Sequence, residues 1–322
     1  MRWHTGINLL VGENGAGKTN ILEGIHIISG WGPLAKGTKS SNIPNWESGS
    51  SDVWLTGESL SKDIIKTKLS NRVTIKLNEK PVTASEMRWN FPLLAFLSDD
   101  MAVIEGSSSN RRRLMNLLLA IIIPVYAKRI AEYARGIRQK AVYLKRGLPT
   151  AVVDSALMPL AAWIWNMRAE AVALIASSLT EIGGLLPGKI DLVLKRGGVA
   201  CCGSVTGLSA EEDYAISVQK NRSEEEARKY PVTGPHRDDI LIFSDGRPAA
   251  DVFSRGLRRR IAIALILALS DGVRRKTGKT PVLILDEVMS ELDANGRKLL
   301  FDALLERKAQ VFAATAEPYS GK

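Results

Sequence analysis

The sequence predicts an α/β fold, a mixed sheet with helices that is interrupted by an inserted helical lobe. Three observations predict this organisation. Ile7 to Val11 form a short apolar run that passes through a glycine-rich turn into a stretch with apolar residues at helical spacing. Val282 to Leu285 form a second apolar run, typical of a buried strand, near the other end of the chain. Between these runs, residues 111–146 and 154–186 consist mainly of helix formers.

The change of character near residue 109 sets the predicted lobe boundaries. We expect residues 1–108 and 187–322 to form the mixed α/β lobe, and residues 109–186 to form the helical lobe. A chain of 322 residues is long enough for about two domains.

The composition is that of an ordinary soluble globular protein. The chain has 45% hydrophobic and 24% charged residues, which excludes collagen-like, mucin-like and largely disordered proteins. Its two cysteines, Cys201 and Cys202, are neighbours, so a disulfide scaffold is excluded and a reducing cytoplasm is expected. The longest apolar run, Leu117 to Ala127, contains a proline and is too short to span a bilayer. Residues 1–6 leave no room for a signal peptide, so we expect a cytoplasmic protein without a membrane partner.

The elements of the first lobe follow in order. Residues 20–29 have the apolar spacing of a helix, and residues 53–82 have the pattern of short strands and turns. Within the latter, Val73 to Leu77 alternates with period two, and residues 78–81 supply a turn.

The later elements include both helices and strands. Pro124 interrupts the first long helix, and the glycine pair at 183–184 ends the second. The remaining predictions are a strand at 190–194, a charged surface helix at 223–230, a hairpin around 240–246, a buried helix at 261–270 and the strand at 282–285.

The glycine-rich turn matches the pattern G-x-x-x-x-G-K-[ST], and it lies between a strand and a helix as that motif requires. In such a loop, backbone N–H groups converge on phosphate oxygens at the positive end of the following helix. The lysine then reaches the β- and γ-phosphates, and the threonine hydroxyl binds Mg²⁺. The predicted ATP-binding residues here are Gly12, Glu13, Asn14, Gly15, Ala16, Gly17, Lys18, Thr19 and Asn20.

The acids that follow the second apolar run complete this predicted site. Asp286 lies at the end of the buried strand, where a carboxylate can hold Mg²⁺ together with Thr19. Glu287 is next to it and can orient or deprotonate the attacking water. We therefore predict Glu287, Asp286 and Lys18 as catalytic residues, and either Ser290 or Asp293 as the cap of the next helix.

A third segment narrows the class of ATPase. Phe253 to Arg260 leads into a buried helix and resembles the signature loop of the ABC ATPase superfamily. In that superfamily the serine and glycine of the loop lie over the γ-phosphate held by a partner subunit, which implies ATP contacts for Ser254 and Gly256. The alternative for Ser254 is an ordinary helix cap followed by a basic surface turn.

These motifs together resemble the RecF family of bacterial recombinational-repair ATPases, which is related to SMC-type heads. The resemblance implies an ABC/SMC-type P-loop ATPase head with an inserted helical lobe. The segment Gly-Pro-His-Arg-Asp-Asp is its most discriminating part. The segments that carry the resemblance, in the order of the family, are residues 9–23, 106–113, 234–239, 254–260, 285–293 and 310–316.

The chain departs from the family pattern at several positions. Only eleven residues precede Gly12, where the family has one or two further strands. Glu287 replaces the second aspartate that is common in the family, and Leu257 to Arg259 replace its usual glutamines. Like the family, the chain has Thr315 where most ABC enzymes have a histidine.

Basic residues concentrate in the first predicted helical stretch. Residues 111–146 contain ten lysines and arginines and one acid, Glu132, so they carry a net charge of +9 in a chain of net charge +10. A solvated helix face is one explanation. For a chain that resembles a DNA-repair ATPase, contact with DNA phosphates is the favoured one. The predicted DNA-binding residues are Arg111, Arg112, Arg129, Arg135, Arg138 and Lys140.

The Gly-Pro-His-Arg-Asp-Asp segment has no assigned chemistry. For His236 and Arg237 we favour a structural role over a catalytic one. Asp238 and Asp239 are candidates for orienting the phosphate loop or the helix after it.

The resemblance implies a function in recombinational repair and replication. Two copies are expected to enclose two ATP·Mg²⁺, close as a clamp on duplex or gapped DNA, and hydrolyse ATP slowly with stimulation by DNA. It also implies help in recombinase loading with RecR and RecO as partners. One alternative is an ABC-type ATPase subunit of a membrane transporter, and another is a structural head that binds ATP without turnover.

Overall fold

The computed structural model describes residues 1–34, 52–70, 73–182, 184–186, 188–199, 208–288 and 292–316. The chain divides into two compact units. The first contains Met1–Ala102 and Ser270–Lys322, and the second contains Val103–Leu269. The predicted lobes grouped residues 187–269 with the mixed lobe instead, so the boundaries of the units differ from the prediction. The reason is that strand β7 (Asp191–Lys195) and helix α6 (Ala210–Lys220) pack against the long helix α5 (Ala151–Leu179) of the second unit.

The first unit is built on a parallel sheet whose strands lie in the order β1-β11-β10-β6. The strands are β1 (Ile7–Val11), β6 (Leu93–Leu97), β10 (Val282–Asp286) and β11 (Val311–Thr315). Helix α1 (Lys18–Ile28) contributes Leu22 to a buried cluster with Ile284 of β10 and Phe312 of β11. Because all four strands are parallel, their carboxyl ends share one edge of the sheet.

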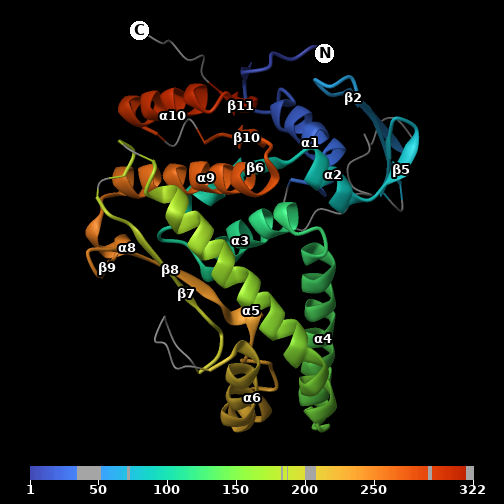
Figure 1. The fold of residues 1–322 in the computed structure, drawn as a ribbon, viewed down its shortest axis with the longest axis vertical. Coiled ribbons are helices and arrows are strands. Elements are labelled where there is room, and N and C mark those ends of the chain that lie inside the picture. Colours follow the sequence, from blue (N-terminus) through green and yellow to red (C-terminus); the bar gives the residue numbers. More distant parts are fainter. Residues whose placement is uncertain are drawn as a thin grey trace. The chain divides into compact units, whose positions relative to one another are not determined.

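A second, antiparallel sheet of the first unit has the order β2-β3-β4-β5. Its strands are β2 (Val53–Glu58), β3 (Ile64–Leu69), β4 (Val73–Leu77) and β5 (Lys80–Val82), which confirms the predicted strands and turns. Figure 1 labels its outer strands, β2 and β5. Helix α2 (Ala84–Asn90) begins with a capping box between Thr83 and Glu86, and its Met87 packs on Ile65 and Ile75. Helix α10 (Ala294–Glu306) is capped by Asp293, one of the two predicted alternatives.

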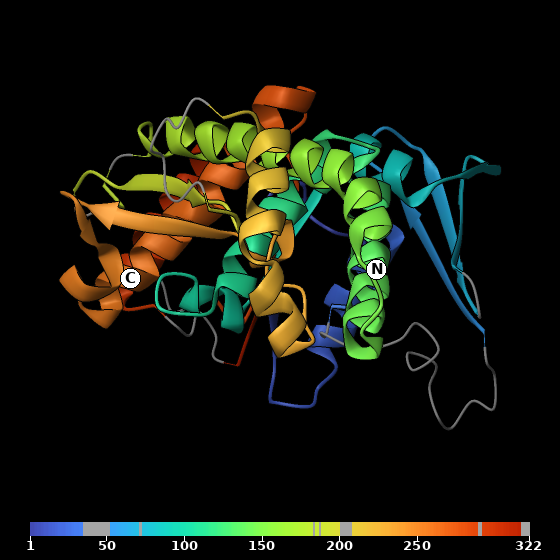
Figure 2. The same ribbon diagram turned by 90° about the horizontal axis from the view of Figure 1, so that it is seen from below.

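The second unit is mainly helical. It contains α3 (Ser108–Ile122), α4 (Tyr126–Arg146) and α5 (Ala151–Leu179), so the break at Pro124 is confirmed. Helix α4 ends at Gly147 in the left-handed conformation, and α4 and α5 pack together as a helical hairpin (Figures 1 and 2). Tyr133 of α4 and Trp165 of α5 are buried in the same apolar cluster.

The rest of the second unit is a small sheet with further helices. The sheet has the order β7-β8-β9, with β7 (Asp191–Lys195), β8 (Asp239–Ser244) and β9 (Arg247–Pro248), so the predicted hairpin is confirmed. The helices are α6 (Ala210–Lys220), α7 (Arg222–Arg228) and α8 (Ala249–Val252), with the short helices η3 (Ser98–Ala102) in the first unit and η4 (Pro235–Arg237) in the second.

Helix α9 (Arg255–Thr277) begins in the second unit and ends in the first, and Ile261 to Leu269 are buried along it, as predicted. In the part of the chain that the structure describes, every helix is too short or too polar to cross a bilayer.

Candidate functional site

The glycine-rich loop joins β1 to α1. Gly15 and Gly17 have φ of 87° and 84°, a left-handed backbone that other residues adopt only with strain, and Gly17 caps the helix. An added Cβ at either glycine would meet open space, so backbone strain explains these two glycines better than crowding does. The loop therefore places the amino end of α1 next to open space, as anion binding requires.

Lys18 is the first residue of α1, and its side chain turns back over the loop. Its Nζ donates hydrogen bonds to the carbonyl oxygens of Gly12, at 2.7 Å, and Glu13, at 3.0 Å. The residue is buried, so the ammonium group is held close to the loop. These two acceptors are neutral, and a phosphate oxygen near them would bind the same ammonium more strongly because the bond would be charge-assisted.

Thr19 and Asp286 meet although they come from opposite ends of the chain. The Thr19 hydroxyl donates a hydrogen bond of 3.2 Å to Asp286 Oδ2. Burial raises the pKa of Asp286, while the Thr19 hydrogen bond and the charge of Lys18 act in the opposite direction. Asp286 Oδ1 is buried and has no hydrogen-bond partner within the described residues. A hydroxyl and a carboxylate oxygen that lacks a partner are the ligands that Mg²⁺ prefers, so this pair fits a Mg²⁺ ion.

Glu287 has an unusual backbone at the end of β10. Its φ of 57° lies in the left-handed region, and its N–H donates to the carbonyl oxygen of Ala314 in β11. A non-glycine residue in this region is held there by its surroundings, and such residues concentrate at functional sites. The half-buried Glu287 thus lies directly after Asp286, but its catalytic role remains a prediction.

Sequence reasoning missed the contribution of β6 to this edge. Strand β6 pairs with β10 in parallel, so the two strands end at the same edge of the sheet. Residues 98–100, the start of η3, follow β6 in the same way that Glu287 follows β10. Asp100 is buried and accepts a hydrogen bond from Leu97 N, whereas Asp99 is exposed. The signal was an apolar run followed by acids, the same pattern that identified Asp286. Asp99 is therefore a further candidate for the nucleotide site.

The predicted signature residues lie at the start of α9. Ser254 and Gly256 are exposed, and they belong to the second compact unit, whereas the glycine-rich loop belongs to the first. Arg258 donates to the carbonyl oxygen of Phe253 and pairs with Glu105, so this arginine stabilises the loop. The predicted contact of Ser254 and Gly256 with ATP of another copy remains a prediction.

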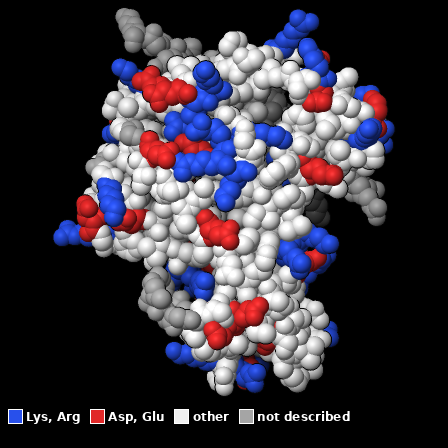
Figure 3. Space-filling view, in the orientation of Figure 1, with Lys and Arg blue, Asp and Glu red and all other residues white. Residues whose placement is uncertain are grey.

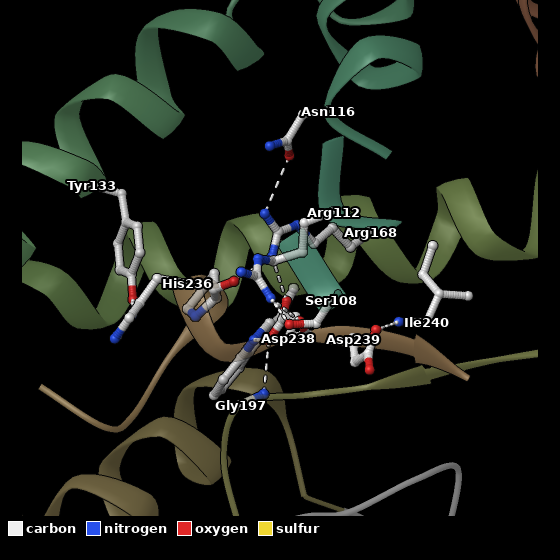
Figure 4. Close-up of polar contacts among 12 residues, drawn as sticks. Ser108, Arg112, Asn116, Tyr133, Arg168, Gly197, His236, Asp238, Asp239 and Ile240 are labelled. Carbon is white, nitrogen blue, oxygen red and sulfur yellow. Dashed lines mark hydrogen bonds and ion pairs between the residues drawn. The ribbon is translucent and has the colours of Figure 1, made fainter. Parts of the chain in front are cut away.

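The Gly-Pro-His-Arg-Asp-Asp segment is bound into the second unit by Asp238 (Figure 4). This carboxylate is completely buried and accepts hydrogen bonds from Arg168 Nη1 at 2.6 Å, Trp165 Nε1 at 2.8 Å and Gly197 N at 2.7 Å. Gly234 has φ of 122°, and an added Cβ there would collide with the hydroxyl of Tyr133. The described partners of the Asp238 carboxylate come from α5 and from the loop after β7. The segment therefore holds these elements together, and these contacts do not involve the phosphate loop.

His236 has a structural environment, as predicted. Its Nε2 lies 3.1 Å from the carbonyl oxygen of Pro231, so it donates, and its Nδ1 accepts from the Tyr133 hydroxyl at 2.8 Å. Both bonds suit the neutral ring. Burial lowers the pKa of His236 to about 4.

Three of the six predicted DNA-binding residues are buried or half-buried and bind groups of the protein. Lys140 has no exposed side-chain surface and pairs with Asp154 at 2.8 Å and Glu225 at 2.5 Å. We therefore remove Lys140 from the predicted DNA surface. Arg111 binds both carboxylate oxygens of Asp239, and Arg112 donates to the carbonyl oxygen of Asp238. Both arginines are half-buried.

The other three predicted residues are exposed on the solvent side of α4. Arg129, Arg135 and Arg138 lie there with Lys128, Lys145 and Arg146, all of them exposed. Glu132 is the one acid of the helix, and it pairs with Arg129 at 3.9 Å. Figure 3 shows blue side chains over the upper part of α4. From residue 128 to residue 146 the helix rises about 27 Å, so we call these six residues the α4 basic face.

The fold and the loop geometry define this chain as a P-loop protein with a helical second unit. The family model "RecF/RecN/SMC N terminal domain" matches residues 1–320, and the chain belongs to this family. This confirms the predicted family and the predicted head fold.

Curated relatives and solved structures agree. The chain is 31% identical over 324 residues to the DNA replication and repair protein RecF of Heliobacterium modesticaldum, covering 96% of this chain and 86% of the relative. It is 30% identical to the DNA replication and repair protein RecF of Teredinibacter turnerae, covering 98% of this chain and 84% of that relative. A solved structure of the recombination mediator protein RecF with ATP matches with a TM-score of 0.83 at 23% identity, covering 100% of this chain and 89% of that one.

Proposed function

We propose that this chain is an ATP-dependent DNA-binding protein of recombinational repair and replication in the cytoplasm. The observation that carries the proposal is the contact of Thr19 with Asp286 beside the glycine-rich loop, which assembles the residues that a bound Mg²⁺·ATP needs. The curated relatives are DNA replication and repair proteins, which supports the same function. A transporter subunit would give no reason for the α4 basic face.

The nucleotide would bind at the amino end of α1. Backbone N–H groups of residues 12–17 would surround the phosphates, and Lys18 would exchange its two carbonyl acceptors for phosphate oxygens. Thr19 and Asp286 would hold the metal. Magnesium, when bound, supplies positive charge that offsets the charge of the phosphate oxygens. Asn20 follows as the next residue of the helix.

Glu287 would act on water. It directly follows Asp286, the proposed metal ligand, and its backbone has the left-handed conformation. There it can orient the attacking water and accept its proton, the usual role of a positioned acid in phosphoryl transfer. The proposed rate is low, and duplex DNA would raise it by stabilising the closed form.

Closure would use a second copy of the chain. Ser254 and Gly256 are exposed at the amino end of α9, where backbone N–H groups can bind a phosphate held by the other copy. ATP can favour the closed dimer only through contacts that it makes in that state, and such a shared phosphate is one. The closed pair would act as a clamp on DNA.

The DNA contact would lie on the α4 basic face. Six exposed cations along about 27 Å of helix can contact backbone phosphates of duplex DNA, and such contacts are independent of sequence. Help in recombinase loading, with RecR and RecO as partners, is the biological role we propose. The RecF protein of the matched ATP-bound structure is a recombination mediator in the RecFOR pathway, which supports this role.

The proposal is tested by binding a gapped duplex and a blunt duplex with and without ATP and Mg²⁺. We expect ATP to tighten binding to both, and more strongly to the gapped DNA. Identical affinities with and without ATP would contradict an ATP-dependent clamp. The hydrolysis rate of Glu287→Gln, with and without duplex, tests the enzyme: equal rates in variant and wild type would remove Glu287 from the mechanism.

A further inference from the structure

One face of the antiparallel β2-β3-β4-β5 sheet is buried and the other is open to solvent. Ile65, Thr67 and Leu69 of β3 and Ile75 of β4 point to the buried side. Side chains alternate along strands, so the residues between them share the opposite face. We call this open face the β2–β4 face. It carries Trp54, Thr56, Glu58, Ile64, Lys66, Lys68, Thr74 and Lys76.

Trp54 is the most unusual residue of the β2–β4 face. It is 67% exposed, although an indole is the largest apolar side chain and normally packs in a core or an interface. Lys68 is its direct cross-strand partner, and Lys68 Nζ lies 5.1 Å from the centre of the Trp54 ring. Lys68 Nζ also pairs with Asp52 at 2.7 Å, and both side chains are about one-third exposed. A phosphate that binds Lys68 next to the ring would therefore replace this carboxylate, as an ion pair open to solvent allows.

Two more lysines occupy the neighbouring row of the face. Lys66 and Lys76 are direct cross-strand partners, an arrangement of like charges that destabilises a sheet. The carboxylate of Glu79 pairs with both of them. The hydrogen bond from Lys66, together with the charges of the two lysines, lowers the pKa of Glu79. All three side chains are largely exposed, so these ion pairs are weak and a phosphate can replace the carboxylate.

We propose that the β2–β4 face binds single-stranded nucleic acid, with a base stacked on Trp54 and phosphates at Lys66, Lys68 and Lys76. The two rows are two residues apart, about 7 Å, which suits successive nucleotides of an extended strand. The flat ring favours a single strand over a duplex as the ligand, because the base faces of a duplex are covered by stacking and cannot reach Trp54. Figure 3 shows blue and red side chains close together at the right edge, over this sheet.

This contact goes beyond the proposed duplex surface and does not rest on it. The β2–β4 face belongs to the first unit and the α4 basic face to the second. The face also needs neither ATP nor a second copy. A protein with both surfaces would contact both the duplex and the single-stranded part of a gap.

The test uses the full chain without nucleotide and a fluorescein-labelled oligothymidylate of twenty nucleotides at low salt, with anisotropy as the readout. We expect Trp54→Ala to weaken binding about 5-fold or more, and Trp54→Phe to restore most of it. The double variant Lys66→Gln with Lys68→Gln should weaken binding and reduce the salt slope by about 0.7 per lost phosphate contact. Lys62→Gln is the matched control, because Lys62 is an exposed lysine in the β2–β3 turn.

Two further readouts separate this proposal from the others. Oligothymidylate should quench the tryptophan fluorescence of the wild type, and Trp54→Ala should lose this quenching while keeping its melting temperature and its duplex affinity. Arg135→Glu with Arg138→Glu should lose duplex affinity and keep oligothymidylate affinity. An oligonucleotide affinity that Trp54→Ala leaves unchanged, or a wild type that does not bind the oligonucleotide, would overturn the proposal.

Discussion

The Thr19 hydroxyl lies 3.2 Å from Asp286 Oδ2, although 267 positions separate the two residues in the chain. The parallel sheet produces this contact, because β1 and β10 both pair with β11 and end at the same edge. The other oxygen of Asp286 is buried without a hydrogen-bond partner in the described residues. Such an oxygen costs free energy unless a cation or a donor binds it.

Asp286→Asn should therefore weaken the binding of ATP in the presence of Mg²⁺ by about 10-fold or more, because the amide removes the negative charge that holds the metal. In EDTA the difference between variant and wild type should disappear. Isothermal titration with ATP measures both. Asp302→Asn, a change of an exposed aspartate in α10, is the control and should bind like the wild type. An equal loss with and without Mg²⁺ would mean that Asp286 supports the loop and not the metal.

Reversal of charge on the α4 basic face should weaken duplex binding. Arg135→Glu with Arg138→Glu removes two cations and adds two anions. The slope of log K against log salt should therefore become less negative by about 0.9 for each lost phosphate contact. The matched control is Lys220→Glu with Arg247→Glu, which makes the same change of charge at exposed residues of α6 and β9. Anisotropy of a labelled duplex at several salt concentrations measures both. The same affinity and slope in the two double variants would reject this surface.

Lys140→Met should destabilise the protein without changing its affinity for DNA. The substitution leaves the buried carboxylates of Asp154 and Glu225 without their cation, a loss of about 3–5 kcal/mol in the free energy of unfolding. Lys128→Met, at an exposed position of the same helix, should change stability by no more than about 0.5 kcal/mol. Urea denaturation measures both variants. A stable Lys140→Met protein with weakened DNA binding would return Lys140 to the DNA surface.

His236 predicts a pH dependence of stability. Its pKa is lowered from 6.5 to about 4, so the unfolded chain takes up a proton at a higher pH than the folded one does. The free energy of unfolding should thus fall as the pH is lowered from about 6.5 to about 4, by about 3 kcal/mol for this group. Carboxyl groups titrate in part of this range too, so the comparison is with His236→Gln, which should lose this part of the dependence. If the free energy of unfolding depended on pH in the same way in the wild type and in His236→Gln, this would contradict a buried, neutral His236 ring.

The sequence predicted the parts of the site whose pattern is local. The glycines of the loop are recognisable because their left-handed backbone needs glycine, and Asp286 follows a strand that is apolar throughout. It also predicted the helix break at Pro124, since proline lacks the N–H of a helical hydrogen bond and often ends a helix, although Pro159 lies within α5. The capping box of α6, Ser209 with Glu212, was present as a signal, and the prediction overlooked it.

What could not be predicted depends on distant parts of the chain. Helical spacing placed Lys140 with the exposed arginines, but its carboxylate partners come from α5 and α7, which no local pattern reveals. The boundary of the second unit has the same origin, because Asp238 binds Arg168 from a position 70 residues away. The open face around Trp54 likewise becomes visible only through the register of three strands.

The measurement that tests the central claim most directly is the sedimentation of Glu287→Gln, alone and with ATP and Mg²⁺. This variant should bind ATP and hydrolyse it very slowly, so the nucleotide-bound state persists during the run. We predict a monomer without ATP and a dimer with it, and Ser254→Arg in the same background should remain a monomer. A Glu287→Gln protein that stays a monomer at saturating ATP and Mg²⁺ would contradict the ATP-driven clamp.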